Sequence, residues 1–469
     1  MVTAATVALG ATIAGAAVIE PSATTVTPNL SSMALPAVTP AAVPTQQTFP
    51  DPTGQSTTLS LTGAVPATHP FFASQGPNGR ACSSCHRPEA GWSITPQELQ
   101  TRFLNTNGLD PVFRTVDGSN SPLANVSTVT ARRAAYSMLL TRGDIRVGLP
   151  VPRAAEFTLA RADDPYHFAS SAQLSLFRRP LPATNLRFLS TVMWDGRETG
   201  PGASILTDLR SQAFDAIVTH EQAIVPPSAT TIDQIVAFES GLYSTQTFDS
   251  GAGSLSAAGA LGSPGSLSSQ PFFIGINDPN GGFPAGSTFN PRVFSVFNTW
   301  ASTAATADPV IRRRQSIARG QAIFNTRPFQ VDNVGGFNDV LHRPLVTATC
   351  STCHNAPNAG SHSLTAFMNL GLTDPVRRTP DMPLYTLRNN ATGALRQTMD
   401  PGRALVTGRW SDIGEFKIPT LRDLPARAPY FHDGSAATTA DVINFYDRRF
   451  RINLNPQERV DLKAFLDSI

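Results

Sequence analysis

The chain has 469 residues, of which 41% are hydrophobic and only 15% charged, a globular composition with a lightly charged surface. This length allows two or three domains rather than one small core. The formal net charge of +2 gives no indication of binding to nucleic acid or to an acidic membrane surface.

The first 60 residues are predicted to be an N-terminal export segment and a linker. Residues 2–19 form an apolar run that resembles the hydrophobic part of a secretory signal without its basic start. A membrane anchor and a disordered tail are the alternatives. Residues 21–52 are rich in proline, threonine, alanine and valine, as in an extended linker. We therefore expect a periplasmic or secreted protein, with membrane anchoring by this segment left open.

All four cysteines occur in two short motifs. In each motif a histidine directly follows a Cys-x-x-Cys pair, giving Cys82, Cys85 and His86 in the first and Cys350, Cys353 and His354 in the second. This is the attachment pattern of haem c: two thiols at this spacing bind the two vinyl groups of one porphyrin, and the adjacent histidine binds the iron. The sequence therefore predicts two covalently bound haem c groups.

Zinc and disulfide bonds are the alternative uses of these cysteines. A zinc site would need the two pairs to fold together and gives no reason for a histidine after each. Disulfides within Cys-x-x-Cys are usually redox-active rather than structural. Both alternatives explain the two motifs less well than haem c does.

The wide separation of the two motifs predicts two haem domains. We place an N-terminal haem domain at residues 61–300 and a C-terminal haem domain at 301–469. Within the first domain, residues 251–270 are rich in glycine, serine and alanine and almost free of charge. This composition is typical of a flexible insertion.

Three helices are predicted in the C-terminal domain. Residues 308–324 and 438–448 each place apolar side chains on one helical face. In the third, Asn455 is a good N-cap, Pro456 suits the first helical position and Glu458 completes a capping box. Because no run of alternating strands is evident, the expected fold class is mainly α: two cytochrome c-like haem domains with long loops and little β structure.

Two further segments are specific to a known family. One is Met193-Trp-Asp-Gly-Arg-Glu198, and the other runs from Phe416-Lys-Ile-Pro-Thr-Leu-Arg422 to Ala428-Pro-Tyr-Phe-His-Asp-Gly434. With the two haem motifs, they resemble the bacterial di-haem cytochrome c peroxidase family, which includes the MauG enzymes that modify other proteins. The resemblance covers roughly residues 65–469.

The resemblance implies different roles for the two haems. In this family peroxide reacts at the N-terminal haem, the C-terminal haem relays electrons, and a tryptophan lies between them. That tryptophan is Trp194 here, with a plain core tryptophan as the alternative. We expect an oxidoreductase that reduces hydrogen peroxide and draws electrons from a donor protein or an oxidisable substrate. A non-catalytic di-haem electron-transfer cytochrome is the alternative.

The resemblance also implies different iron ligands at the two sites beyond His86 and His354. In the MauG branch a tyrosine ligates the C-terminal haem, and the matching residue is Tyr446; Met382 or Met399 is the alternative. Peroxidases carry a removable distal histidine shortly after the first motif, but here no histidine follows until His167. An open N-terminal site is expected, with closure by His167 as the alternative.

An acid–base group near the N-terminal haem is a further implication. The family uses a glutamine and, ten residues later, a glutamate. Gln212 matches the first position, whereas Gln222 stands at the second. Glu221 is therefore our first candidate for the acid–base group, and His220 is the next.

The family also holds a calcium ion between its domains, partly through backbone carbonyls. Arg427 and Pro429 occupy those positions here. The usual asparagine ligand is replaced near residues 178–180, with Asn185 nearby. The sequence therefore leaves calcium open.

Overall fold

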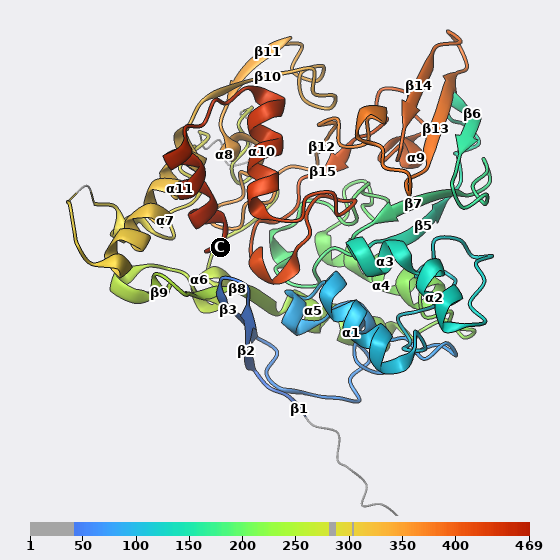
Figure 1. Ribbon diagram of the computed structural model, residues 1–469, viewed down its shortest axis with the longest axis horizontal. Helices are drawn as coiled ribbons and strands as arrows, with labels where there is room; N and C mark the ends of the chain where they lie inside the picture. The colour runs from blue at the N-terminus through green and yellow to red at the C-terminus, as the bar shows by residue number, and fades with distance from the viewer. Residues whose placement is uncertain (1–41, 281–287, 303) are drawn as a thin grey trace, which may run out of the picture. The chain divides into compact units, whose positions relative to one another are not determined.

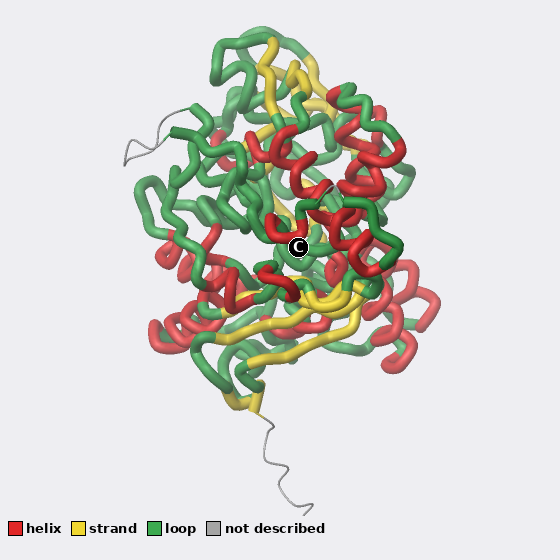
Figure 2. The backbone as a smooth tube through the Cα atoms, turned by 90° about the vertical axis from the view of Figure 1, so that its left-hand side faces the viewer, coloured by secondary structure: helices red, strands yellow, loops and turns green. Residues whose placement is uncertain are grey.

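The computed structural model describes residues 42–280, 288–302 and 304–469 (Figure 1). It is 30% helical and 18% strand, with long loops between the elements (Figure 2). The prediction of a mainly α fold with little β structure is therefore wrong. The predicted export signal at residues 2–19 lies outside the described residues. Within the described ranges, no helix is both long and apolar enough to cross a bilayer.

The strands form small antiparallel sheets. The largest has the order β2–β3–β8–β9, at Gln46–Asp51, Gly54–Ser60, Leu242–Asp249 and Gly253–Ser254. A second has the order β14–β13–β6, at Leu395–Thr398, Leu384–Asn389 and Phe157–Asp163. The two-stranded pairs are β1 with β4 (Ala42–Val43, Val65–Pro66), β5 with β7 (Ile145–Leu149, Leu174–Arg178), β10 with β11 (Phe329–Asp332, Leu345–Ala348) and β12 with β15 (Phe367–Met368, Phe416–Lys417).

The central strands of the largest sheet are rich in threonine and serine, which explains why they escaped prediction. β3 and β8 are largely buried, and their hydroxyls pair across the sheet. Thr57 Oγ1 lies 2.8 Å from Thr247 Oγ1, and Thr58 donates to Ser244 at 3.3 Å. Threonine favours strands because it is β-branched, and its buried hydroxyl needs a partner. The sheet therefore forms without the apolar alternation that marks a strand in a sequence.

The helices are distributed along the whole described chain, and α8 is itself the second cysteine motif. They are α1 (Pro96–Thr106), α2 (Val129–Ala135), α3 (Ser137–Arg142), α4 (Ile205–Thr219), α5 (Ala229–Ser240), α6 (Pro264–Ser268), α7 (Pro309–Thr326), α8 (Cys350–Cys353), α9 (Ala404–Thr407), α10 (Thr439–Phe450) and α11 (Pro456–Leu466). The three predicted C-terminal helices are confirmed as α7, α10 and α11. Asn455 caps α11, and Glu458 completes the capping box.

Residues from both sides of the predicted domain boundary at residue 300 pack against one another. Ala252, Leu255 and Trp300 are buried in one core with Ile317 and Phe465, and β6 pairs with β13. The glycine- and serine-rich segment 251–270 is therefore packed against the C-terminal helices, in contrast to the flexible insertion that its composition suggested. The division of the chain into 61–300 and 301–469 stays a prediction.

Helices α7 and α11 lie side by side (Figure 1), and a glycine sets how closely they approach. A Cβ atom on Gly320, in the middle of α7, would lie 1.9 Å from the backbone oxygen of Asp461 on α11. The Asp461 side chain returns across the same contact, accepting from Ser316 at 2.6 Å and from Arg319 at 2.7 Å. Because Gly320 has no side chain, the backbones of α7 and α11 can come into direct contact at this point.

We expect Gly320→Ala to destabilise the protein. Overpacking costs about 1–3 kcal/mol, which exceeds the ~1 kcal/mol that alanine contributes to helix propensity. The thermal unfolding temperature measures the net effect. Gly265→Ala in α6 is the matched control, because the nearest atom to its new Cβ would be Ser263 Oγ at 4.0 Å. Equal unfolding temperatures for Gly320→Ala and the parent would contradict the close helix contact.

Candidate functional site

Two cavities lie inside the protein, and each is walled by one cysteine motif. The C-terminal cavity contains Cys350, Cys353 and His354, and the N-terminal cavity contains Cys82, Cys85 and His86. Their empty spaces are about 1690 and 1240 Å³, volumes that include space open to solvent. The walls are mainly apolar, with Phe324, Phe329, Val331 and Phe450 in the first and Phe71, Leu186, Leu189 and Ile235 in the second.

Both motif histidines are held as neutral imidazoles. His86 Nδ1 lies 3.0 Å from the Trp92 carbonyl oxygen, and His354 Nδ1 lies 2.7 Å from that of Gly360. A carbonyl only accepts, so each Nδ1 carries the proton and each Nε2 keeps a free lone pair. Burial lowers the pKa of His86, and it lowers the pKa of His354 to about 4. Such imidazoles are suited to bind a metal.

The thiols do not support the zinc and disulfide alternatives. All four cysteines are free, and the two pairs lie in separate cavities. Burial raises the pKa of Cys85 to about 11 and of Cys350 and Cys353 to about 12, so none is a reactive thiolate. Among the described residues, no three His, Cys, Asp or Glu side chains gather as a metal site.

Trp194 and Lys417 line both cavities. The Trp194 indole donates from Nε1 to the backbone oxygen of Arg179 at 2.8 Å, and its ring centre lies 6.3 Å from that of His432. The buried Lys417 ammonium donates to the Thr191 backbone oxygen at 3.0 Å. Burial lowers the pKa of Lys417 to about 7. One aromatic side chain, Trp194, and two basic ones, Lys417 and Arg179, therefore border both sites.

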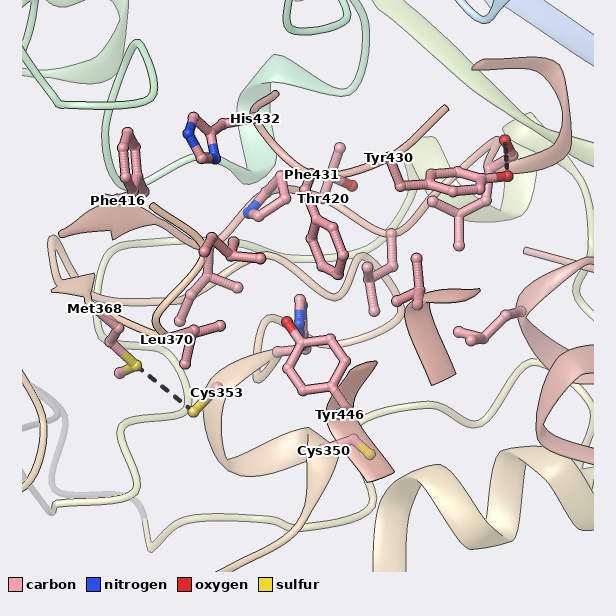
Figure 3. Close-up of a pocket in the computed structure, with 18 of the residues that line it drawn as sticks. Cys350, Cys353, Met368, Leu370, Phe416, Thr420, Tyr430, Phe431, His432 and Tyr446 are labelled. Atoms are coloured by element: carbon pink, nitrogen blue, oxygen red, sulfur yellow. Dashed lines mark hydrogen bonds between the residues drawn. The ribbon is translucent and has the colours of Figure 1, made fainter. Parts of the chain in front are cut away.

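Tyr446 projects from α10 into the C-terminal cavity, with its hydroxyl directed toward the interior (Figure 3). Burial raises the pKa of its phenol, so the phenolate would need a cation beside it. Met382 and Met399 pack in a separate core cluster, outside this cavity. The methionine that does line the cavity is Met368, whose Sδ lies 3.7 Å from Cys353 Sγ. Met368 thus replaces the two methionines that the sequence offered as alternatives.

The three acid–base candidates line the N-terminal cavity: Gln212 on α4, followed by His220 and Glu221. Glu221 is buried, and its Oε2 accepts from the Gln75 backbone N–H at 2.7 Å. Burial raises the pKa of Glu221 to about 7, so at neutral pH it can both give and take a proton. Gln222 instead accepts from Asn78 at 3.2 Å and does not line the cavity.

His220 is held by a charge network. Its Nδ1 contacts the Asp117 carboxylate, which also pairs with Arg80. Asp117 and Arg80 are buried, and both line the N-terminal cavity. His167, in contrast, is exposed and lines neither cavity.

Sequence analysis missed Glu239, a buried acid in the wall of the N-terminal cavity. Burial raises its pKa to about 8, and its Oε1 lacks a hydrogen-bond partner among the described residues. The sequence nevertheless contains a pattern that indicates this residue. Glu239 follows Ile235 by four residues on the buried face of α5, where an acidic side chain needs a reason.

Comparison with known proteins identifies relatives that are named cytochrome c peroxidases. The chain is 31% identical over 141 residues to cytochrome-c peroxidase IdrP1 of Denitromonas iodatirespirans, covering 26% of this chain and 37% of the relative. It is 32% identical over 121 residues to cytochrome c551 peroxidase of Nitrosomonas europaea, covering 26% and 30%. These matches support the resemblance to the di-haem cytochrome c peroxidase/MauG family. The similarity spans about a third of the length of these curated relatives.

Two further comparisons complete this picture. A solved structure of a MauG-like protein associated with microbial copper homeostasis matches with a TM-score of 0.37 and 16% identity, over 85% of this chain and 87% of that one. No family model matches the chain.

The residues around both cavities fit haem c, the cofactor of this di-haem family. Each cavity combines apolar walls with two thiols and a neutral imidazole. Haem also carries two propionate carboxylates, and basic side chains border both cavities: Arg179 and Lys417 at both, Arg427 at the C-terminal one and Arg178 at the N-terminal one. An anion bound beside the buried Lys417 amine would favour its charged form.

The residues do not fit the family's calcium ion. The Arg427 carbonyl oxygen, one of the two positions implied by the resemblance, accepts a hydrogen bond from Arg179 Nη2 at 3.1 Å. Asn185, the remaining asparagine candidate, donates to the Ser244 backbone oxygen at 2.9 Å. An arginine side chain therefore lies where the cation was expected.

We predict two covalent haem additions in protein matured by a haem c-exporting host. Replacing Cys82 and Cys85 with alanine should remove one addition, and replacing Cys350 and Cys353 should remove the other, since each pair lies in its own cavity. Intact-protein mass spectrometry gives the count. Ser83→Ala, between the cysteines of the first motif, is the control and should keep both. A bare polypeptide mass for the parent would contradict haem attachment.

Proposed function

We propose that the chain is an exported di-haem c oxidoreductase that reduces hydrogen peroxide in the N-terminal cavity. Electrons would come through the C-terminal cavity from a donor protein or an oxidisable substrate, as in a peroxidase or a MauG-like enzyme. The observation that carries this proposal is the unequal chemistry of the two cavities. Glu221, His220 and Gln212 line the N-terminal one, whereas Tyr446 projects into the C-terminal one.

Haem, when bound, supplies iron redox chemistry at both sites. The protein's own contribution at the N-terminal site is proton transfer. Cleavage of peroxide moves a proton from one oxygen to the other, and a carboxyl with a pKa of about 7 accepts and returns it near neutral pH. The Gln75 N–H holds the carboxylate of Glu221 in the cavity wall. The Gln212 amide lines the same cavity and would orient a small polar ligand.

Trp194 is the proposed bridge for electrons, because its ring borders both cavities. The hydrogen bond from its Nε1 to Arg179 fixes the plane of the indole. The non-catalytic alternative, a plain electron-transfer cytochrome, gives no role to a buried acid–base group in one cavity alone.

The direct test mixes the resting ferric protein with stoichiometric peroxide by stopped flow. We expect a rapid loss of the high-spin Soret absorption without added reductant, since the exposed His167 does not lie over the N-terminal cavity. Glu221→Gln should slow the reaction by about 10²–10⁴-fold. The matched control is Glu198→Gln, which removes a carboxyl bonded to Ser211 outside both cavities.

Two results would contradict the proposal. Absence of any reaction until a reductant is added would mean that the N-terminal iron is closed in the resting protein. Equal rates for Glu221→Gln and the parent would exclude Glu221 as the acid–base group.

We also propose that Tyr446 ligates the iron bound by His354. Tyr446→Phe removes the only donor atom and keeps the ring, so the low-spin ferric signal of that haem should disappear or change form. Tyr430→Phe is the control in the same cavity, because the Tyr430 hydroxyl donates to the Leu424 backbone oxygen at 2.9 Å. Electron paramagnetic resonance of the ferric variants measures this signal. A signal that survives Tyr446→Phe but is lost in Met368→Leu would assign the iron to the thioether instead.

A further inference from the structure

The Arg179 side chain ends in a cluster of backbone oxygens. Its Nη1 donates to Arg142 at 3.0 Å, and its Nη2 donates to Ile94 at 2.6 Å and to Arg427 at 3.1 Å. Ile94 and Arg142 belong to the N-terminal half of the chain, and Arg427 precedes the Pro-Tyr-Phe-His-Asp-Gly segment in the C-terminal half. The guanidinium therefore joins three segments that are far apart in the sequence.

A buried acidic side chain, Asp144, also acts on Arg179, and burial raises the pKa of its carboxyl well above the usual value. Asp144 is 1% exposed, and neither of its oxygens has a hydrogen-bond partner among the described residues. It acts on Arg179 electrostatically, opposing the burial that lowers the arginine pKa to about 10. At neutral pH the guanidinium thus stays charged. Carbonyl oxygens such as the three that accept from Arg179 are ligands of the kind that calcium prefers.

The chain leaves space for this guanidinium at Gly143. A Cβ atom there would lie 1.8 Å from Arg179 Nη1. Gly143 also ends α3 in the left-handed region, with φ of 67°, where glycine is favoured. The arginine therefore lies in a position that the neighbouring backbone is shaped to admit, rather than in a loosely filled gap.

We propose that the Arg179 guanidinium takes the place of the divalent cation that the family resemblance implies between the two haem-binding halves. The arginine then stabilises the contact between these segments, and the protein does not use calcium. For calcium to reach the Arg427 carbonyl, the guanidinium would have to leave its three acceptors, since two buried cations cannot share them. This inference does not rest on the proposed reaction.

The first test uses the parent holoprotein with both haems attached. Elemental analysis after gel filtration should find no stoichiometric calcium. The thermal unfolding temperature should be the same with a chelator as with added calcium. One calcium per chain, together with a lower unfolding temperature in the chelator, would overturn the proposal, and this test needs no variant to fold.

The second test removes the guanidinium. Arg179→Ala leaves three carbonyls and Asp144 without a cation, so its unfolding temperature should fall by about 3–5 °C, and added calcium should restore part of that loss. Arg153→Ala, at an exposed arginine, is the control and should behave as the parent. An Arg179→Ala protein as stable as the parent, or one that calcium leaves unchanged, would show that the guanidinium does not occupy a cation site.

Discussion

Arg178 centres a buried ion network that fixes the region between the two cavities. Its guanidinium contacts Asp195 at 2.6 Å and Asp400 at 2.7 Å, and all three side chains are buried. The network raises the pKa of Arg178 and lowers the pKa of Asp195 to about 2. Removing one member of such a network costs about 3–5 kcal/mol, because a buried charge is left unpaired. Trp194 precedes Asp195, so the network also sets where the indole lies.

Arg179, the next residue in the chain, connects further segments to the ion network of Arg178. The backbone N–H of Arg179 donates to the His432 carbonyl at 2.6 Å, and its backbone oxygen accepts from Trp194. Two consecutive arginines therefore connect the Trp-Asp-Gly segment, the His-Asp-Gly turn and the loop after the first haem motif. The family motifs are, in physical terms, the contact points of one buried polar network, and residues of this network line both apolar cavities.

Local signals in the sequence predicted local structure well. The Asn455 capping box and the motif histidines depend only on neighbours within a few residues, and the structure has the helix start where the cap predicts it. β13 depends on β6, more than 200 positions earlier in the chain, and no local pattern shows that pairing. Similarly, Gln222 matches the family position by count, but the cavity contains Glu221, because the chain turns at Gln222 with a positive φ of 57°. The cation role of Arg179 depends on carbonyls from three distant segments, which no sequence pattern reveals.

The central claim is that the two cavities hold irons with unlike surroundings, one open to peroxide and one closed by a protein ligand. An electron paramagnetic resonance spectrum of the resting ferric holoprotein tests it directly. The account predicts one high-spin and one low-spin ferric signal of equal intensity. Two low-spin signals would contradict it, since both irons would then be closed, as expected of a plain electron carrier.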